Sequence, residues 1–239
     1  MTGRTVLVLL AVGLASCSPE AHSRPEPATR LAATLVSPTD ITLEWTGAEP
    51  GAAGRIVEFA TEPGGRYTIL QFGPPGQTTY THPDLIPETP FYYRVRPYYG
   101  PASRAVEVTL PEGPFNGAAQ QRDHTWAEPR TVPGGAVATR SVRDGGAAPT
   151  ELRATVMHAN GIRFTWTDHA RDEEGFLLEV KPREAADFSV AAVLDPDINS
   201  FGLITLPQEK KAAFRVRAFA YGRPSNVAHQ TTGPEPSPT

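Results

Sequence analysis

Two matching stretches stand out in this chain: Ile41-Thr42-Leu43-Glu44-Trp45 and Ile162-Arg163-Phe164-Thr165-Trp166. In each, apolar and polar side chains alternate, which is typical of a β-strand with one buried face. The two stretches lie 121 residues apart, and the same spacing aligns the chain without a gap from Leu31 to Tyr98. Solenoids and propellers repeat every 20 to 50 residues or so, and a longer period indicates a whole domain used twice.

Each copy contains further short apolar runs separated by turn residues such as Gly64-Gly65 and Pro74-Pro75. No stretch shows a helical stripe. Six or seven short strands in a domain of this size predict an antiparallel β-sandwich. The sequence therefore predicts an all-β protein with two sandwiches in tandem.

The pattern resembles a tandem of fibronectin type III domains. The residues that carry the resemblance are the strand-end tryptophans Trp45 and Trp166, the glycines Gly54 and Gly175, and the runs 85–95 and 206–216. The resemblance implies immunoglobulin-like sandwiches over residues 29–111 and 149–232.

Two local features depart from that family. Phe91 and Ala212 stand where it usually has a corner tyrosine, so we expect looser corners, above all in the second copy. Pro97 lies inside a predicted strand and cannot donate to a ladder, so regular pairing should stop near Arg96.

The N-terminus has a positive start, an apolar run from Val6 to Leu14, and then Leu14-Ala15-Ser16-Cys17. The run is too short to span a bilayer and reads as a signal-peptide core. The segment resembles a bacterial lipoprotein signal, which implies removal of residues 1–16 by cleavage between Ser16 and Cys17, and lipid on Cys17. An ordinary secretory signal and a retained anchor are the alternatives. Residues 17–28 would then be the lipidated cysteine and a flexible tether of an exported, membrane-anchored protein in the cell envelope, in the outer membrane or on the outer face of the cytoplasmic membrane.

Residues 112–148 form a Gly/Pro/Ala-rich linker, and residues 233–239 a Pro-rich tail. A linker of this length would let the domains move independently. It contains Trp126, which either packs on a domain or contacts a ligand, and a segment at 132–137 that could close a small hairpin.

Alternation along residues 92–98 places Tyr92, Arg94, Arg96 and Tyr98 on one outward face. We weigh two interpretations of this face. In one, the arginines pair with Glu58 on the neighbouring strand and have a structural role. In the other, the four residues form an aromatic and basic binding stripe, with Trp126 as a further contact.

The loop from Asp168 to Glu174 is rich in metal-ligand types, but its spacing matches no established metal loop. The first copy has Gly47 to Ala53 at this place, so we expect a solvated turn, no metal and no cofactor. The six histidines are scattered, and no nucleophile elbow, zinc-binding helix or phosphate loop is present, so we expect no enzyme and no small-molecule substrate. The net charge of −4 speaks against nucleic acid.

These observations favour a non-catalytic, lipid-anchored envelope protein whose two modules interact with an unidentified protein or surface polysaccharide. A purely structural spacer or assembly component is the main alternative. An accessory subunit of a secreted polysaccharide-degrading system is a third.

Overall fold

The structure is a computed structural model that describes residues 28–113 and 124–234. The strands of the first repeat are β1 (Arg30–Ser37), β2 (Asp40–Thr46), β3 (Gly54–Ala60), β4 (Thr68–Gly73), β5 (Thr79–His82), β6 (Pro90–Tyr99) and β7 (Val106–Thr109). The linker contributes a 3-10 turn, η1 (Thr125–Ala127), and β8 (Ala136–Arg140). The second repeat has β9 (Thr150–His158), β10 (Gly161–Ala170), β11 (Gly175–Pro182), β12 (Ser189–Leu194), β13 (Ser200–Ile204), η2 (Pro207–Glu209), β14 (Lys211–Tyr221) and β15 (Ala228–Thr231).

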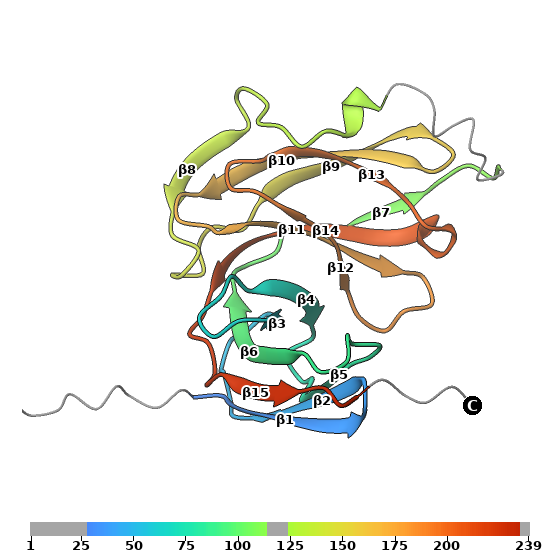
Figure 1. The fold of residues 1–239 in the computed structure, drawn as a ribbon. Coiled ribbons are helices and arrows are strands. Elements are labelled where there is room, and N and C mark those ends of the chain that lie inside the picture. Colours follow the sequence, from blue (N-terminus) through green and yellow to red (C-terminus); the bar gives the residue numbers. More distant parts are fainter. Residues whose placement is uncertain (1–27, 114–123, 235–239) are drawn as a thin grey trace, which may run out of the picture.

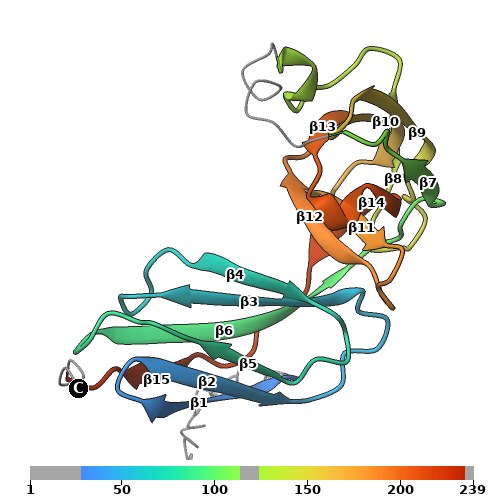
Figure 2. The ribbon, with the colours of Figure 1, turned by 90° about the vertical axis from the view of Figure 1, so that its right-hand side faces the viewer.

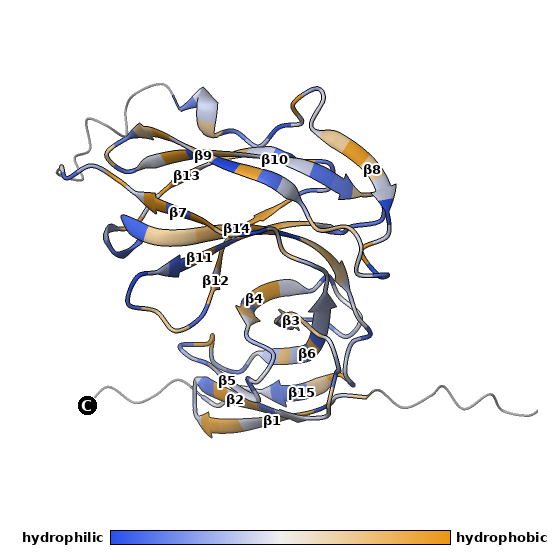
Figure 3. Cartoon of the chain, turned by 180° about the vertical axis from the view of Figure 1, so that it is seen from behind, coloured by the Kyte–Doolittle hydropathy of each residue, from blue (hydrophilic) through white to orange (hydrophobic). Residues whose placement is uncertain are grey.

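Each repeat contributes most strands of one antiparallel sandwich, as expected (Figure 1). In the first, the sheet β1-β2-β5 faces a sheet that contains β4, β3 and β6; in the second, β9, β10 and β13 face β12, β11 and β14. Hydrophilic and hydrophobic residues alternate along strands such as β10 (Figure 3), because one face of each sheet is turned to the core. Trp45 and Trp166 are both 3% exposed and belong to the two separate cores. The described part of the chain contains no helix with the length and hydrophobicity needed to cross a membrane.

The last strand of each sandwich comes from the other repeat. β7 follows β6 in the chain, yet it pairs with β14 of the second sandwich, from Lys211↔Thr109 to Phe214↔Val106. β15 follows β14 and pairs with β6 of the first sandwich, from Ala228↔Tyr93 to Thr231↔Pro90. Figure 1 shows β15 beside β1 and β6, far from β14, and Figure 2 shows the same arrangement from the side.

The exchanged strands are built into the cores that they join. Val108 and Leu110 are buried in the core of the second sandwich, and Ala228 is buried in the core of the first. The division into contiguous domains at 29–111 and 149–232 therefore differs from the structure at one strand in each copy. Neither repeat contains all the strands of its own sandwich.

The crossing points are the six-residue connections 100–105 and 222–227. Gly100 has φ of +134°, and a Cβ on it would lie 2.0 Å from the carbonyl oxygen of Ala218, so only glycine fits. Each connection also contains a proline, Pro101 or Pro224. Short, stiff connections disfavour a tight hairpin and favour exchange of the strand that follows.

The two sandwiches share a continuous sheet at the crossing. Ala220 and Tyr221 of β14 pair with Tyr99 and Tyr98 of β6, which joins the two larger sheets into one of eight strands. A third apolar cluster fills the junction; its buried members are Ile56, Tyr98, Leu177 and Phe219. The sequence predicted that the two domains move independently. The shared sheet and the buried cluster instead join them directly.

The described part of the linker packs on the second sandwich. β8 pairs in parallel with the end of β10, at Asp168↔Ala136 and Ala170↔Arg140. Val142 and Ala147 are 1% and 0% exposed and belong to the second core. The segment at 132–137 closes a turn, with the amide of Gly135 donating to the carbonyl of Val132 at 3.3 Å, and then continues into β8 rather than forming a hairpin.

Pro97 does not end its strand, contrary to expectation, because β6 pairs with β3 as far as Gly54↔Tyr98. The carbonyl of Pro97 accepts from the amide of Gly222. The backbone groups of Pro97 therefore point toward the crossing segment and away from β3. The missing N–H is therefore on the side where no regular ladder is needed.

Other polar groups replace the corner tyrosine. In the first copy, Thr232 of the exchanged segment donates to the carbonyl of Ile86 at 2.7 Å and accepts from the amide of Thr89 at 2.9 Å. In the second, the carboxylate of Glu209 accepts from the amide of Leu206 at 2.8 Å. Both corners are thus closed by hydrogen bonds that do not need a tyrosine.

Candidate functional site

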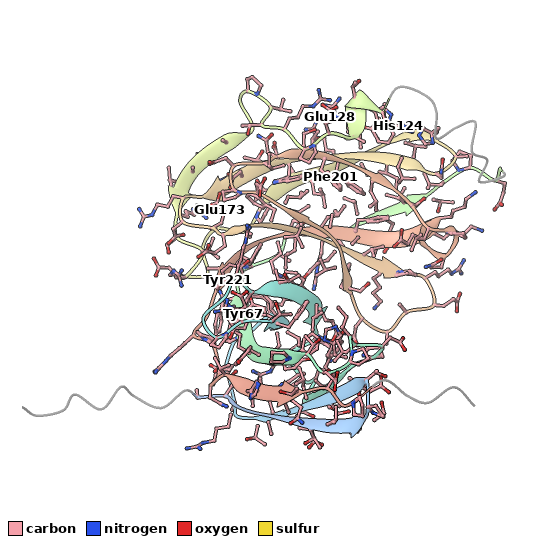
Figure 4. The ribbon with its side chains drawn as sticks, in the orientation of Figure 1. Tyr67, His124, Glu128, Glu173, Phe201 and Tyr221 are labelled. Carbon is pink, nitrogen blue, oxygen red and sulfur yellow. The ribbon has the colours of Figure 1, made fainter. Side chains whose placement is uncertain are left out.

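The arginines of the expected binding stripe are committed to internal contacts. Arg94 and Arg96 both donate to the carboxylate of Glu58, at 2.6 Å and 3.0 Å. Glu58 is only 4% exposed. The guanidinium of Arg94 also lies 3.9 Å from the ring centre of Tyr67, and that of Arg96 lies 4.5 Å from the ring centre of Tyr221. Tyr67 and Tyr221 flank this network near the junction of the sandwiches (Figure 4).

The tyrosines of the stripe are likewise engaged. Tyr98 is 4% exposed, because its ring packs edge-on against Phe72 and Phe219 in the junction. Burial, together with the negative charge of Glu179, raises the pKa of Tyr98 to about 12. Tyr92 is half-buried and stacks on His229 of the exchanged strand, with ring centres 4.6 Å apart. These side chains therefore do not form one exposed face.

The second copy repeats the network around Glu179. Arg215 and Arg217 both donate to this carboxylate, with a distance of 2.9 Å for Arg217, and Arg215 lies over the ring of Phe188. Arg217 also donates to the carbonyl of Gly100 at 2.6 Å, so the network holds the crossing segment of the first repeat. Removing one partner of a buried pair leaves an unpaired buried charge, which costs about 3–5 kcal/mol.

Trp126 lies on the second sandwich, away from the residues of β6. Its indole covers Gly161 and Gly202, where any Cβ would collide with the ring at 2.8 Å and 2.6 Å. It also meets the ring of His158 edge-on at 5.4 Å. Trp126 is half-buried, because its indole packs the linker onto the outer face of β10 and β13.

The acidic loop after β10 holds the linker. The carboxylate of Asp172 accepts from the hydroxyl of Ser141 at 2.6 Å and from the amide of Val142 at 2.8 Å. These hydrogen bonds lower the pKa of Asp172. The loop of the first copy, from Gly47 to Ala53, has a single acid, Glu49, which accepts from the hydroxyls of Thr29 and Tyr99, each at 3.1 Å.

An open groove of about 520 Å³ lies on the outer face of the second sandwich, where β7, β14 and β11 run side by side. Glu107, Ala213 and Lys181 form one row across these three strands. The groove exists because Ala213 is small; the corresponding residue of the first copy is Tyr92, whose ring fills that place. One wall of the groove is the exchanged strand β7.

Three cations border this groove: Lys181, Arg183 and Lys211. None of them forms an ion pair with another described residue. A second groove of about 360 Å³ shares Lys181 and Phe188 with the first and extends to residues 71–75 of the first sandwich. The two grooves together, which we call the basic groove, reach residues of both sandwiches, and their lining also includes the acids Glu107 and Asp187. Sequence analysis missed it because its walls combine segments of both repeats that are distant in the chain.

No protein-family model and no curated protein matches this chain. Solved structures resemble it. A fibronectin type III-like (Fn3-like) protein from Clostridium thermocellum is 34% identical over 28% of this chain and 69% of its own, with a TM-score of 0.26. The FN1–FN3 domains of chicken CNTN1 are 18% identical over 87% of this chain and 67% of theirs, with a TM-score of 0.27. A segment of two fibronectin type III domains from chicken tenascin is 11% identical over 85% of this chain and 99% of its own, with a TM-score of 0.26.

TM-scores of this size do not establish a shared fold. The fold is therefore assigned from the strand order of the structure itself. Each unit packs a three-stranded antiparallel sheet against a second sheet of neighbouring strands, as an immunoglobulin-like sandwich does. The chain is a tandem of two fibronectin type III-like sandwiches with exchanged final strands. The expected lipidation site Cys17 and cleavage site at Ser16 lie outside the described residues.

Proposed function

We propose that this protein is a non-catalytic, lipid-anchored component of the cell envelope whose two sandwiches act as one interaction module. Sandwiches of this kind serve many proteins as modules for binding protein or carbohydrate. The observation that carries the proposal is the basic groove, which crosses both sandwiches and offers unpaired cations beside an aromatic ring. Such a surface suits an acidic partner, either an anionic surface polysaccharide or an acidic segment of another protein.

The shape of the groove supports binding of an extended chain. Its length comes from two sandwiches that are joined by a shared sheet and a buried cluster, so its two halves keep a fixed spacing. A preformed site loses little entropy when it binds. Phe188 supplies an apolar surface at the point where the two halves meet.

The N-terminal sequence supports an anchor. Cys17 is the single cysteine of the chain and stands where a lipoprotein signal requires it. Lipid on this residue would tie the module to the membrane, since two or more acyl chains anchor a protein stably. The Cys17→Ser variant should appear in the medium or remain as an unprocessed precursor. Fractionation of this variant with the membranes, as for the wild type, would overturn the anchor.

Crosslinking in intact cells tests the binding surface. The Lys181→Glu, Arg183→Glu double variant should lose the partners that the wild type captures, because it reverses two of the three cations of the basic groove. The control is Arg66→Glu, Arg153→Glu, which changes the net charge equally at exposed positions elsewhere. Equal capture by both double variants would refute the groove as the contact surface.

A structural spacer is the second candidate, and a specific observation favours it. The large hydrophobic side chains exposed on the described residues are aliphatic and scattered over many elements, from Val36 to Val227. A spacer needs no contiguous apolar patch, whereas many binding sites have one. In this case the groove variant would leave captured partners unchanged, while deletion of one sandwich would alter the spacing of the assembly.

A further inference from the structure

An aspartate occupies a core-facing position at the end of β10. The inward residues of this strand are Ile162, Phe164, Trp166 and then Asp168. Asp168 is 0% exposed. A carboxylate in this place is unexpected, because alternation reserves the position for an apolar side chain.

Only half of this carboxylate is satisfied. Oδ1 of Asp168 accepts from the amide of Ala170 at 2.8 Å. Oδ2 is buried and accepts no hydrogen bond from any residue that the structure describes. A buried charge with a free oxygen is costly unless it is paired or coordinates a metal.

Two further carboxylates converge on Asp168. One oxygen each from Asp168, Glu173 and Asp197 lies within 4.8 Å of the others. Glu173 accepts from the amide of Asp197 at 3.2 Å, which fixes these two residues relative to each other. Glu173 is drawn at this end of the second sandwich in Figure 4.

All three groups of this cluster are carboxylates, so each adds negative charge to the same place. Burial, and to a lesser extent the negative charges of Glu173 and Asp197, raise the pKa of Asp168 to about 6, against the lowering effect of the hydrogen bond from the amide of Ala170. Three carboxylates that share one site repel one another, and a cation between them removes both the repulsion and the unpaired oxygen.

We propose that Asp168, Glu173 and Asp197 form a binding site for one calcium ion. Ca²⁺ prefers carboxylate oxygens and accepts irregular geometry at about 2.3–2.6 Å, so oxygens on opposite sides of the ion lie about 4.6–5.2 Å apart. Mg²⁺ binds at about 2.0–2.1 Å in a strict octahedron, which spans no more than about 4.2 Å. The three oxygens lie close enough together, within 4.8 Å of one another, to bind one ion, and the tolerance of Ca²⁺ for irregular geometry suits one buried, one half-buried and one exposed carboxylate, with water completing the shell.

The site lies beneath the docked linker. The amide of Asp168 donates to the carbonyl of Gly135 at 2.8 Å, and the hydroxyl of Thr131 donates to the carbonyl of Asp197 at 2.7 Å. The side chain of Asn199 brackets Val132, accepting from its amide at 2.6 Å and donating to its carbonyl at 3.1 Å. Calcium would therefore fix the turns that hold the linker, and its binding would stabilise the docked linker.

The site belongs to the second sandwich alone. At the spacing of 121 residues, the positions of the three acids correspond to Gly47, Ala52 and Gly76 in the first copy, none of which has a ligand side chain. Asp168 and Glu173 come from one loop and Asp197 from a distant turn, so the spacing within the loop could not reveal the third acid. This explains why a solvated turn was expected here.

Calcium titration of the full chain, stripped with EDTA, tests the proposal. We expect a dissociation constant of about 0.1–1 mM, as for extracellular calcium modules. Calcium should also slow tryptic cleavage after the exposed Arg140 several-fold, because this residue lies on the docked linker. The Asp168→Asn and Asp197→Asn variants should bind at least tenfold more weakly, and Asp195→Asn, which removes an equal charge from the same turn, should bind as the wild type does.

Thermal unfolding separates a ligand role from a structural one. Without calcium, Asp168→Asn should melt above the wild type, because it removes an unpaired buried charge. Calcium should raise the melting temperature of the wild type and leave that of Asp168→Asn unchanged. The proposal fails if about 10 mM Ca²⁺ produces no binding signal, if Asp195→Asn loses as much affinity as Asp197→Asn, or if Mg²⁺ acts equally at the same concentration.

Discussion

A disulfide between positions 107 and 213 tests the strand exchange directly. Glu107 of β7 and Ala213 of β14 are register partners, so their Cα atoms lie about 4.5–5.5 Å apart, as antiparallel partners do. Disulfides bridge Cα atoms about 4.4–6.8 Å apart. The Glu107→Cys, Ala213→Cys variant, made together with Cys17→Ser, should therefore oxidise to a bridge within one chain.

The effect on stability follows from the length of the closed loop. The bridge would enclose roughly 100 residues, and loss of loop entropy in the unfolded chain then stabilises the native state by about 4.7 kcal/mol. For a protein of 150–250 residues, 1 kcal/mol moves the melting temperature by about 2–4 °C. We expect the oxidised variant to melt about 9–19 °C above its reduced form.

The control places the second cysteine where the alternative arrangement needs it. If β7 stayed with β6, Glu107 would lie opposite Tyr92, the place that His229 holds in this structure. A Tyr92→Cys, Glu107→Cys variant should remain reduced. Non-reducing electrophoresis, thiol counting and differential scanning calorimetry follow both variants.

The exchange is refuted if the 92–107 pair oxidises and the 107–213 pair does not. A disulfide-linked dimer from the 107–213 variant would contradict exchange within one chain and show that strands pass between two copies.

Three further outcomes are expected. Glu179→Ala should lower the free energy of unfolding in urea by about 3–5 kcal/mol, because it removes the carboxylate that pairs with the buried Arg217 and the half-buried Arg215; a loss below about 1 kcal/mol would show a solvent-screened network. Trp126→Ala should cost roughly 2 kcal/mol, about half the value for a fully buried tryptophan, whereas a side chain that serves only as a ligand contact would leave stability unchanged. Burial lowers the pKa of His82 below 6.5 in the folded state, so the unfolded chain binds more protons and stability should fall as pH drops through about 6.5; His82→Gln should remove this part of the pH dependence.

The sandwiches could be predicted because short stretches of sequence indicate each strand, and the same pattern occurs in both repeats. Alternation in β2 and β10 shows which side chains face the core, and the repeat shows that one solution is used in both halves. The pairing of Glu58 with Arg94 and Arg96 follows from the same alternation, once neighbouring strands are assigned.

The strand exchange could not be read in this way. β7 and β15 follow nearly equivalent strands, and each must pair with whichever of β6 and β14 it reaches. The alternation of β7 fits either neighbour, so periodicity alone leaves the choice open. Pro101 and Pro224 in the short connections are the signal that could have indicated exchange.

The candidate sites were missed for a related reason. Tyr98 points outward from its own sandwich, and sequence could not show that Phe219 of the other repeat covers it. The basic groove and the three acids likewise combine segments that are distant in the chain. Each is a product of tertiary contacts that a single strand pattern does not contain.

The crossing at Gly100 also constrains how this gene can change. In an ordinary tandem array, unequal recombination removes or adds a copy and leaves the neighbours intact. Here, loss of either copy would take away a strand of the other and expose an unpaired edge, which is prone to aggregate. Selection would then keep both copies together in the gene, even while their surface residues diverge.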